Sequence, residues 1–119
     1  MDFLTRETIL NAQDIKTEEV LVPEWGGKVL VKALSGTERD EFEQSIVGYA
    51  GKTPKMKMDN VRAKLAVQAV VDEKLQQLFT IADVVGLGRK SAVALNRVYE
   101  VASRLSGLPP EDVEELTKN

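Results

Sequence analysis

Residues 18–34 contain the pattern that decides the fold, and they read Glu-Glu-Val-Leu-Val-Pro-Glu-Trp-Gly-Gly-Lys-Val-Leu-Val-Lys-Ala-Leu. Two runs rich in valine and leucine, residues 18–22 and 28–34, flank a segment with a proline and two adjacent glycines. This spacing is typical of a β-hairpin, in which a short turn joins two antiparallel strands. Because a lone hairpin is only marginally stable in water, we expect it to pack on helices.

Two capping patterns predict helices on either side of the hairpin. Thr5 is a suitable N-cap for a short helix that ends near Ala12. After the hairpin, Ser35 and Glu38 have the spacing of a capping box, in which each side chain bonds to the other residue's backbone N–H. The helix that they start should run to about Val47.

The middle of the chain combines a polar segment with an apolar one. Residues 48–58 contain two glycines, a proline and three lysines, so we expect a mobile loop there. Asp59 should cap the next helix, whose second half, residues 65–71, is apolar on nearly every side. Such a helix lies at the centre of a fold. A strand is the alternative interpretation, because valine is frequent in this segment.

The last third of the chain has the clearest helical pattern. A short helix is expected from Thr80 to the glycines at 86 and 88, and a long one over residues 89–106. Gly107 stands where helices end in the left-handed conformation, and Pro109 and Pro110 would open a last short acidic helix.

These patterns together predict an α+β fold that is mostly α. We expect a single domain over residues 1–119, in which an N-terminal β-hairpin packs on a small bundle of about four to five helices. The mobile loop near residues 48–58 would interrupt this domain.

Composition argues against most enzyme classes. The chain has no cysteine and no histidine, so it lacks disulfides, thiolate metal sites and the commonest general base. The carboxylates at Glu38, Asp40, Glu41 and Glu43 are interpreted as the solvated face of a helix rather than a metal site. We therefore expect no catalytic residue, no metal and no cofactor. No apolar run is long enough to span a membrane, and the N-terminus lacks the pattern of a signal peptide.

Charge is distributed unevenly along the chain, whose formal net charge is −3. Residues 52–64 carry five cations against Asp59, and residues 111–119 carry four anions against Lys118. Such asymmetry can serve self-association or a partner's surface. The alternative is that these charges are ordinary solvated faces.

A helix-turn-helix is the alternative to a protein-binding role. Residues 80–98 are expected to form a short helix, a glycine turn and a longer helix, in the order found in helix-turn-helix motifs. The longer helix carries Arg89, Lys90 and Arg97, which could contact phosphates. An ordinary corner between two helices needs glycine for the same reason. Because the net charge is negative, we do not expect nucleic acid to be the partner.

Four stretches, taken in order, resemble the tail assembly chaperones of long-tailed bacteriophages. They are residues 4–10 (Leu-Thr-Arg-Glu-Thr-Ile-Leu), 16–27 (the run that ends in Pro-Glu-Trp-Gly-Gly), 34–40 (Leu-Ser-Gly-Thr-Glu-Arg-Asp) and 104–108 (Arg-Leu-Ser-Gly-Leu). The resemblance covers nearly the whole chain. The turn with its tryptophan, followed by the Gly-Thr-Glu-Arg-Asp helix start, is its most distinctive part.

The resemblance implies an assembly role. Such chaperones bind the tape measure protein, a long and largely helical chain, and keep it soluble until tail tube subunits polymerise around it. The protein would then act in the cytoplasm of an infected or lysogenic bacterium. Many members also have a longer form, made by a −1 ribosomal frameshift, that recruits tube protein. Codons for Thr117-Lys118-Asn119 can form a slippery sequence, although these residues can equally be a polar tail.

Two features are candidates for partner binding. One is the apolar stripe of the last long helix, formed by Leu95, Val98, Tyr99, Ala102 and Leu105. The other is Trp25, the only tryptophan, which lies in the hairpin turn. The alternative is that the stripe belongs to the domain's own core and that Trp25 folds back over the hairpin as a lid.

Overall fold

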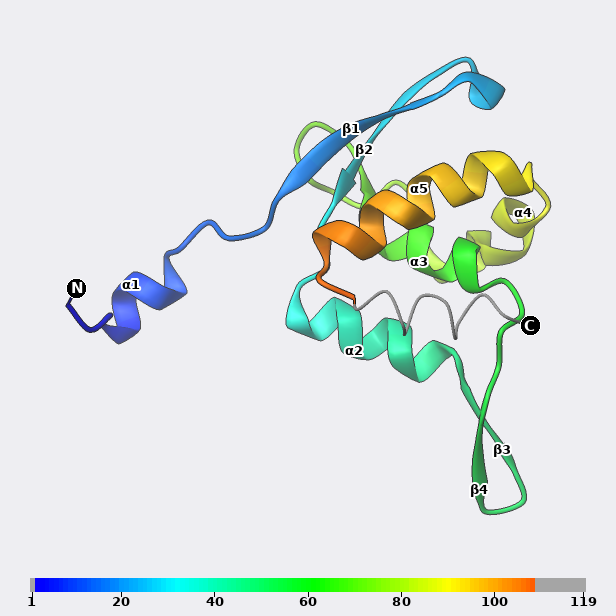
Figure 1. The fold of residues 1–119 in the computed structure, drawn as a ribbon, viewed down its shortest axis with the longest axis horizontal. Coiled ribbons are helices and arrows are strands. Elements are labelled where there is room, and N and C mark those ends of the chain that lie inside the picture. The colour runs from blue at the N-terminus through cyan, green and yellow to red at the C-terminus, as the bar shows by residue number, and fades with distance from the viewer. Residues whose placement is uncertain (1, 109–119) are drawn as a thin grey trace.

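The computed structural model of the chain describes residues 2–108, and Figure 1 shows its helices between two β-structures. The helices are α1 (Arg6–Leu10), α2 (Gly36–Ser45), α3 (Val61–Ala69), α4 (Val84–Gly88) and α5 (Ala92–Leu105). The strands are β1 (Thr17–Val22), β2 (Gly27–Lys32), β3 (Val47–Ala50), β4 (Thr53–Met56) and β5 (Val70–Val71). Short 3₁₀ turns are formed by η1 (Pro23–Trp25) and η2 (Ile81–Asp83).

The predicted hairpin is confirmed and gains a third strand. β1 pairs with β2 in antiparallel register, with Val20 opposite Val29, and Gly26 takes the positive φ of 76° that the turn requires. β5 then pairs with the outer edge of β2, which places Val70 opposite Val31. The sheet order is therefore β1-β2-β5.

Helix α3 occupies the centre of the molecule. It contacts α2, α4 and α5, and none of its residues is exposed. The prediction of a central helix is thus confirmed for residues 61–69, and its expected apolar half corresponds to residues 65–69. The last two residues of the expected helix, Val70 and Val71, form β5 instead, because β2 offers them backbone partners.

The helix caps follow the sequence prediction in two cases out of three. Thr5 caps α1 by accepting a bond from Thr8 N, and Ser35 and Glu38 form the capping box of α2. Asp59 is not the cap of α3. Asn60 holds that position with φ of 55° and makes no side-chain capping bond.

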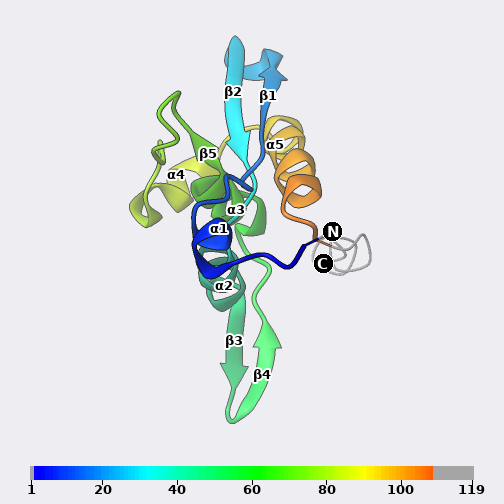
Figure 2. The same ribbon diagram turned by 90° about the vertical axis from the view of Figure 1, so that its left-hand side faces the viewer.

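Residues 48–58 are not an irregular loop. They form most of an antiparallel ribbon, the β3–β4 ribbon, in which Val47 lies opposite Met56 and Ala50 opposite Thr53. A two-residue turn with Gly51 at φ of 66° allows the chain to reverse sharply. Figures 1 and 2 show the ribbon extending from the helices on the side opposite the β1–β2 hairpin. Its mobility stays a prediction.

The end of α5 agrees with the sequence pattern. Gly107 has φ of 70°, as expected for a helix terminus. The expected acidic helix after Pro109 lies outside the described residues. Among residues 2–108, no helix is long and apolar enough to cross a membrane.

A buried ion pair joins the sheet to α2. The Lys32 ammonium, whose side chain is 9% exposed, donates to the Glu38 carboxylate and to the carbonyl oxygen of Ala33. Burial raises the pKa of Glu38, but bonds from Lys32 and from the Ser35 backbone outweigh it, so this pKa lies below its usual range. The Glu38 carboxylate therefore caps α2 and also balances the charge of Lys32 at the end of β2.

Replacing Glu38→Gln should lower the free energy of unfolding by about 1–3 kcal/mol at neutral pH. Glutamine keeps a capping-box oxygen, so the loss would report the charge that balances Lys32. Because the folded-state pKa of Glu38 is depressed, its contribution is present above the unfolded pKa. It is lost as the pH falls below about 4.3 and through the folded value.

Urea unfolding of both proteins between neutral and acidic pH measures this difference. Glu43→Gln is the matched control, since the exposed Arg39–Glu43 pair should contribute about 0.5 kcal/mol or less. Equal losses of unfolding free energy for the two substitutions would show that the buried Lys32–Glu38 pair contributes no more than the exposed pair. A loss for Glu38→Gln that grows as the pH falls would contradict the depressed pKa of Glu38.

Candidate partner-binding surfaces

The apolar stripe of α5 lies in the core. Leu95, Val98, Tyr99 and Ala102 are each 5% exposed or less, and Leu105 is half-buried. α5 packs this face against α3 and the β1–β2 hairpin. The stripe is therefore not a surface open to a partner in this structure, which agrees with its alternative interpretation as core.

Trp25 is half-buried and packs against the core at the tip of the hairpin. The neighbouring Glu24 accepts two bonds from Arg97 of α5, both at 3.0 Å. These bonds lower the pKa of Glu24 and raise that of Arg97. The geometry favours the packing role of Trp25, with part of the indole left at the surface.

The same contacts weaken the helix-turn-helix interpretation. Arg97, one of the three cations that could contact phosphates under that interpretation, is held by Glu24 in a forked ion pair. Ala94 and Leu95, near the start of α5, are buried in the core and so are not exposed for contact with a DNA groove. The α4–α5 pair is thus an ordinary corner that closes the core.

The N-terminal arm, residues 2–16, exposes apolar side chains. Helix α1 contributes no buried residue, and Figure 1 shows it away from the body of the molecule. Four apolar side chains of the arm are more than half exposed: Phe3, Leu4, Ile9 and Leu10. Leu4 precedes the cap and Ile9 is the fourth helical residue, which is the spacing of a hydrophobic staple. Sequence reasoning found this helix but not its exposure, because periodicity does not show what a face packs against.

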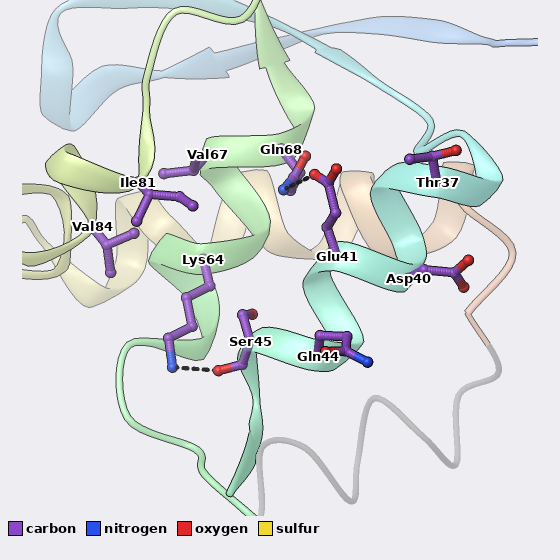
Figure 3. Close-up of a pocket in the computed structure, with 10 residues that line it drawn as sticks. All are labelled: Thr37, Asp40, Glu41, Gln44, Ser45, Lys64, Val67, Gln68, Ile81 and Val84. Carbon is purple, nitrogen blue, oxygen red and sulfur yellow. Dashed lines mark hydrogen bonds between the residues drawn. The ribbon is translucent and has the colours of Figure 1, made fainter.

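A second open surface is the groove between α2, α3 and the η2–α4 segment (Figure 3). It has a volume of about 730 Å³. Val67, Ile81 and Val84 form an apolar wall, and Ile81 is 82% exposed. This groove was not found from the sequence, since its walls are distant along the chain.

The opposite wall of the groove is polar and is fixed by bonds between helices. Gln68 donates to the Glu41 carboxylate at 3.2 Å, and Lys64 donates to the carbonyl oxygen of Ser45 at 3.0 Å. Asp40 adds a second carboxylate. A groove with an apolar wall and a polar wall that carries two carboxylates and one ammonium suits a helix with an apolar stripe and polar or basic flanks.

Nothing in residues 2–108 gathers three acidic side chains in a geometry that could hold a metal ion. Three carboxylates of α2 are instead engaged within the fold: Glu38 pairs with Lys32 of β2, Glu43 pairs with Arg39 of the same helix, and Glu41 accepts a bond from Gln68 of α3.

Comparison with known proteins finds one matching family and a solved structure with a similar fold. The family model described as phage tail assembly chaperone matches residues 5–119. Among solved structures, the tail assembly chaperone of bacteriophage HK97 is similar, with a TM-score of 0.57 and 21% sequence identity. The match covers 83% of this chain and 94% of that one, and at this identity it shows a shared fold. No curated protein sequence matches the chain.

Proposed function

This chain belongs to the phage tail assembly chaperone family, and we propose that it binds the tape measure protein and keeps it soluble before the tail tube forms. The family's role is one of assembly rather than catalysis. A long helical protein that awaits assembly exposes apolar stripes, which would otherwise aggregate. A small protein with exposed apolar segments of its own can cover such stripes.

The observation that carries this proposal is the apolar exposure of the N-terminal arm. A five-residue helix is too short to be stable alone in water, and none of its residues is buried by the part of the chain that the structure describes. Burying a leucine, isoleucine or phenylalanine side chain contributes about 1.5–3 kcal/mol. Phe3, Leu4, Ile9 and Leu10 would therefore gain most from binding an apolar helix of a partner.

The groove beside α2 would provide a second contact. Its apolar wall can bury part of a helix, and its carboxylates at Asp40 and Glu41 can select basic flanks. Two weak contacts that act together give useful affinity without preventing release. Release matters, because tube subunits must displace the chaperone as they polymerise. We place this activity in the cytoplasm of the bacterial host.

Replacing Ile9→Asp together with Leu10→Asp should abolish most of the solubilising effect on the tape measure protein. The physical reason is that two apolar side chains lose their favourable burial in the complex while the core is untouched. Co-expression followed by measurement of the soluble tape measure fraction checks this, and thermal unfolding of the variant alone should match the parent.

Leu21→Asp is the matched control, because Leu21 is 67% exposed on the hairpin and lies outside both surfaces. It should leave the soluble fraction unchanged. If the arm variant still keeps the tape measure protein soluble while Leu21→Asp does not, the arm is not the binding surface.

A longer form of the chain would recruit tail tube protein. This part of the proposal rests on the family resemblance and on the final residues Thr117-Lys118-Asn119, whose codons can permit a −1 slip. The gene sequence tests it directly. We expect an uninterrupted run of adenines ahead of the Asn119 codon and an overlapping −1 reading frame; an AAG codon for Lys118 would exclude the slip.

A further inference from the structure

The β3–β4 ribbon has two faces of different chemistry. Successive side chains of a strand alternate between its faces, and residues paired across the ribbon share a face. Lys55 and Lys57 therefore lie on one face. Pro54 and Met56 lie on the other, together with Val47, which is opposite Met56. All five residues are exposed, so the ribbon offers a cationic face and an apolar face to solvent.

The cationic face is not neutralised by the part of the chain that the structure describes. Residues 46–58 contain no acidic residue, although the net charge of the protein is −3. Neither Lys55 nor Lys57 forms a salt bridge within residues 2–108. The Lys57 stem lies across β3, where a Cβ on Gly48 would be only 2.7 Å from its Cε. The lack of a side chain at Gly48 thus lets Lys57 lie over the neighbouring strand.

The register shows which backbone groups of β3 are available to another strand. Lys57 N donates to the carbonyl oxygen of Ile46 at 2.5 Å, so these two residues form a hydrogen-bonded pair. In an antiparallel ladder such pairs alternate with pairs whose N–H and C=O groups point away from the partner strand. On β3 the outward groups therefore belong to Val47 and Tyr49.

The two edges of the ribbon differ in what they offer. On β4 the position opposite Tyr49 is Pro54, which has no N–H. The ribbon loses no bond through this proline, since an N–H there would point away from β3, but a further strand cannot pair fully with the β4 edge. β3 contains no proline, and among the described residues it pairs only with β4. Figures 1 and 2 show the ribbon extending clear of the helices, so the β3 edge is open.

We propose that the β3 edge binds an extended segment of a partner protein in which apolar and acidic residues alternate. The backbone of this segment bonds to the outward groups of Val47 and Tyr49, as in other cases of strand addition. Its apolar side chains lie on the face of Val47, and its acidic side chains lie on the face of Lys55 and Lys57. A third strand also stabilises the ribbon, because an isolated pair of strands is marginal in water. This contact goes beyond the helix-binding surfaces proposed above and does not depend on them.

Charge and register favour this occupant over two others. A second copy that pairs its own β3 antiparallel to this one brings no acidic residue, and it places the lysines of both copies on the same face. Nucleic acid neutralises the lysines but leaves the apolar face in water, and a protein with a net charge of −3 repels it. A segment that is apolar on one side and acidic on the other matches both faces of the ribbon.

NMR spectroscopy of the ¹⁵N-labelled full chain tests this contact. The probe is a blocked peptide that alternates valine with glutamate, whose like charges keep it monomeric at neutral pH. When the peptide saturates the protein, amide exchange at Val47 and Tyr49 should slow by at least about tenfold. The amide of Met56, which points outward from the other edge, should be unchanged.

A second peptide, which alternates valine with lysine, tests the role of charge. It should bind about tenfold more weakly than the glutamate peptide, because its cations lie beside those of the ribbon. The difference should shrink in 1 M salt, where charges are screened within about 3 Å.

Tyr49→Pro tests the edge itself, because it removes an outward N–H without removing a bond between β3 and β4. It should weaken binding of the glutamate peptide by at least about tenfold, whereas Tyr49→Val, the matched control, should leave binding unchanged. A fully N-methylated glutamate peptide gives the same test on the unaltered protein if the proline disturbs the ribbon. It cannot donate N–H groups to β3 and should not bind.

Charge reversal tests the selection of acidic segments. Lys55→Glu with Lys57→Glu should reverse the preference, so that the lysine peptide binds more tightly than the glutamate peptide. Lys74→Glu with Lys90→Glu changes two exposed lysines outside the ribbon and is the matched control, which should keep the original preference.

Several outcomes would overturn the proposal. These are protection that appears at Met56 or in β1 instead of β3, equal binding of the two peptides, and no binding at millimolar peptide. Slow exchange at Val47 and Tyr49 that depends on protein concentration alone would assign the edge to a second copy. Binding of a single-stranded oligonucleotide to the ribbon, with both peptides inactive, would assign the lysines to nucleic acid.

Discussion

Helix α3 imposes the constraint on which the rest of the structure depends. Its second half is apolar apart from Gln68, so it is stable only if neighbouring elements remove most of its surface from water. α5 covers it with Leu95, Val98 and Ala102, α2 adds Phe42, and the β-sheet closes a further side through β5. Apolar surface that covers α3 cannot also bind a partner.

Binding must therefore use parts of the chain that the core does not need. The N-terminal arm and the β3–β4 ribbon have this property, and the groove beside α2 has it in part, since its wall shares Val67 with the core. They surround a closed core, and they differ in chemistry, since the arm is apolar, the groove has one apolar and one polar wall and the ribbon is basic. A chaperone benefits from this division, because its partner can come and go without unfolding it.

Features encoded by neighbouring residues could be predicted from the sequence. The hairpin turn, the Ser35–Glu38 capping box and the Gly107 terminus each depend on residues a few positions apart. β5 could not be predicted, because a two-residue strand exists only through its pairing with distant β2. Likewise, the spacing of Val98 and Tyr99 showed that one face of α5 is covered, but not whether the cover is α3 or a partner.

Hydrogen–deuterium exchange of the chain, alone and bound to the tape measure protein, tests the central claim that core and binding surfaces are separate. The account predicts slow exchange in α3 and α5 in both states, and fast exchange in residues 2–16 that becomes slow on binding. Unchanged fast exchange in residues 2–16, with new protection confined to α5, would contradict it and return the binding surface to Val98 and Tyr99.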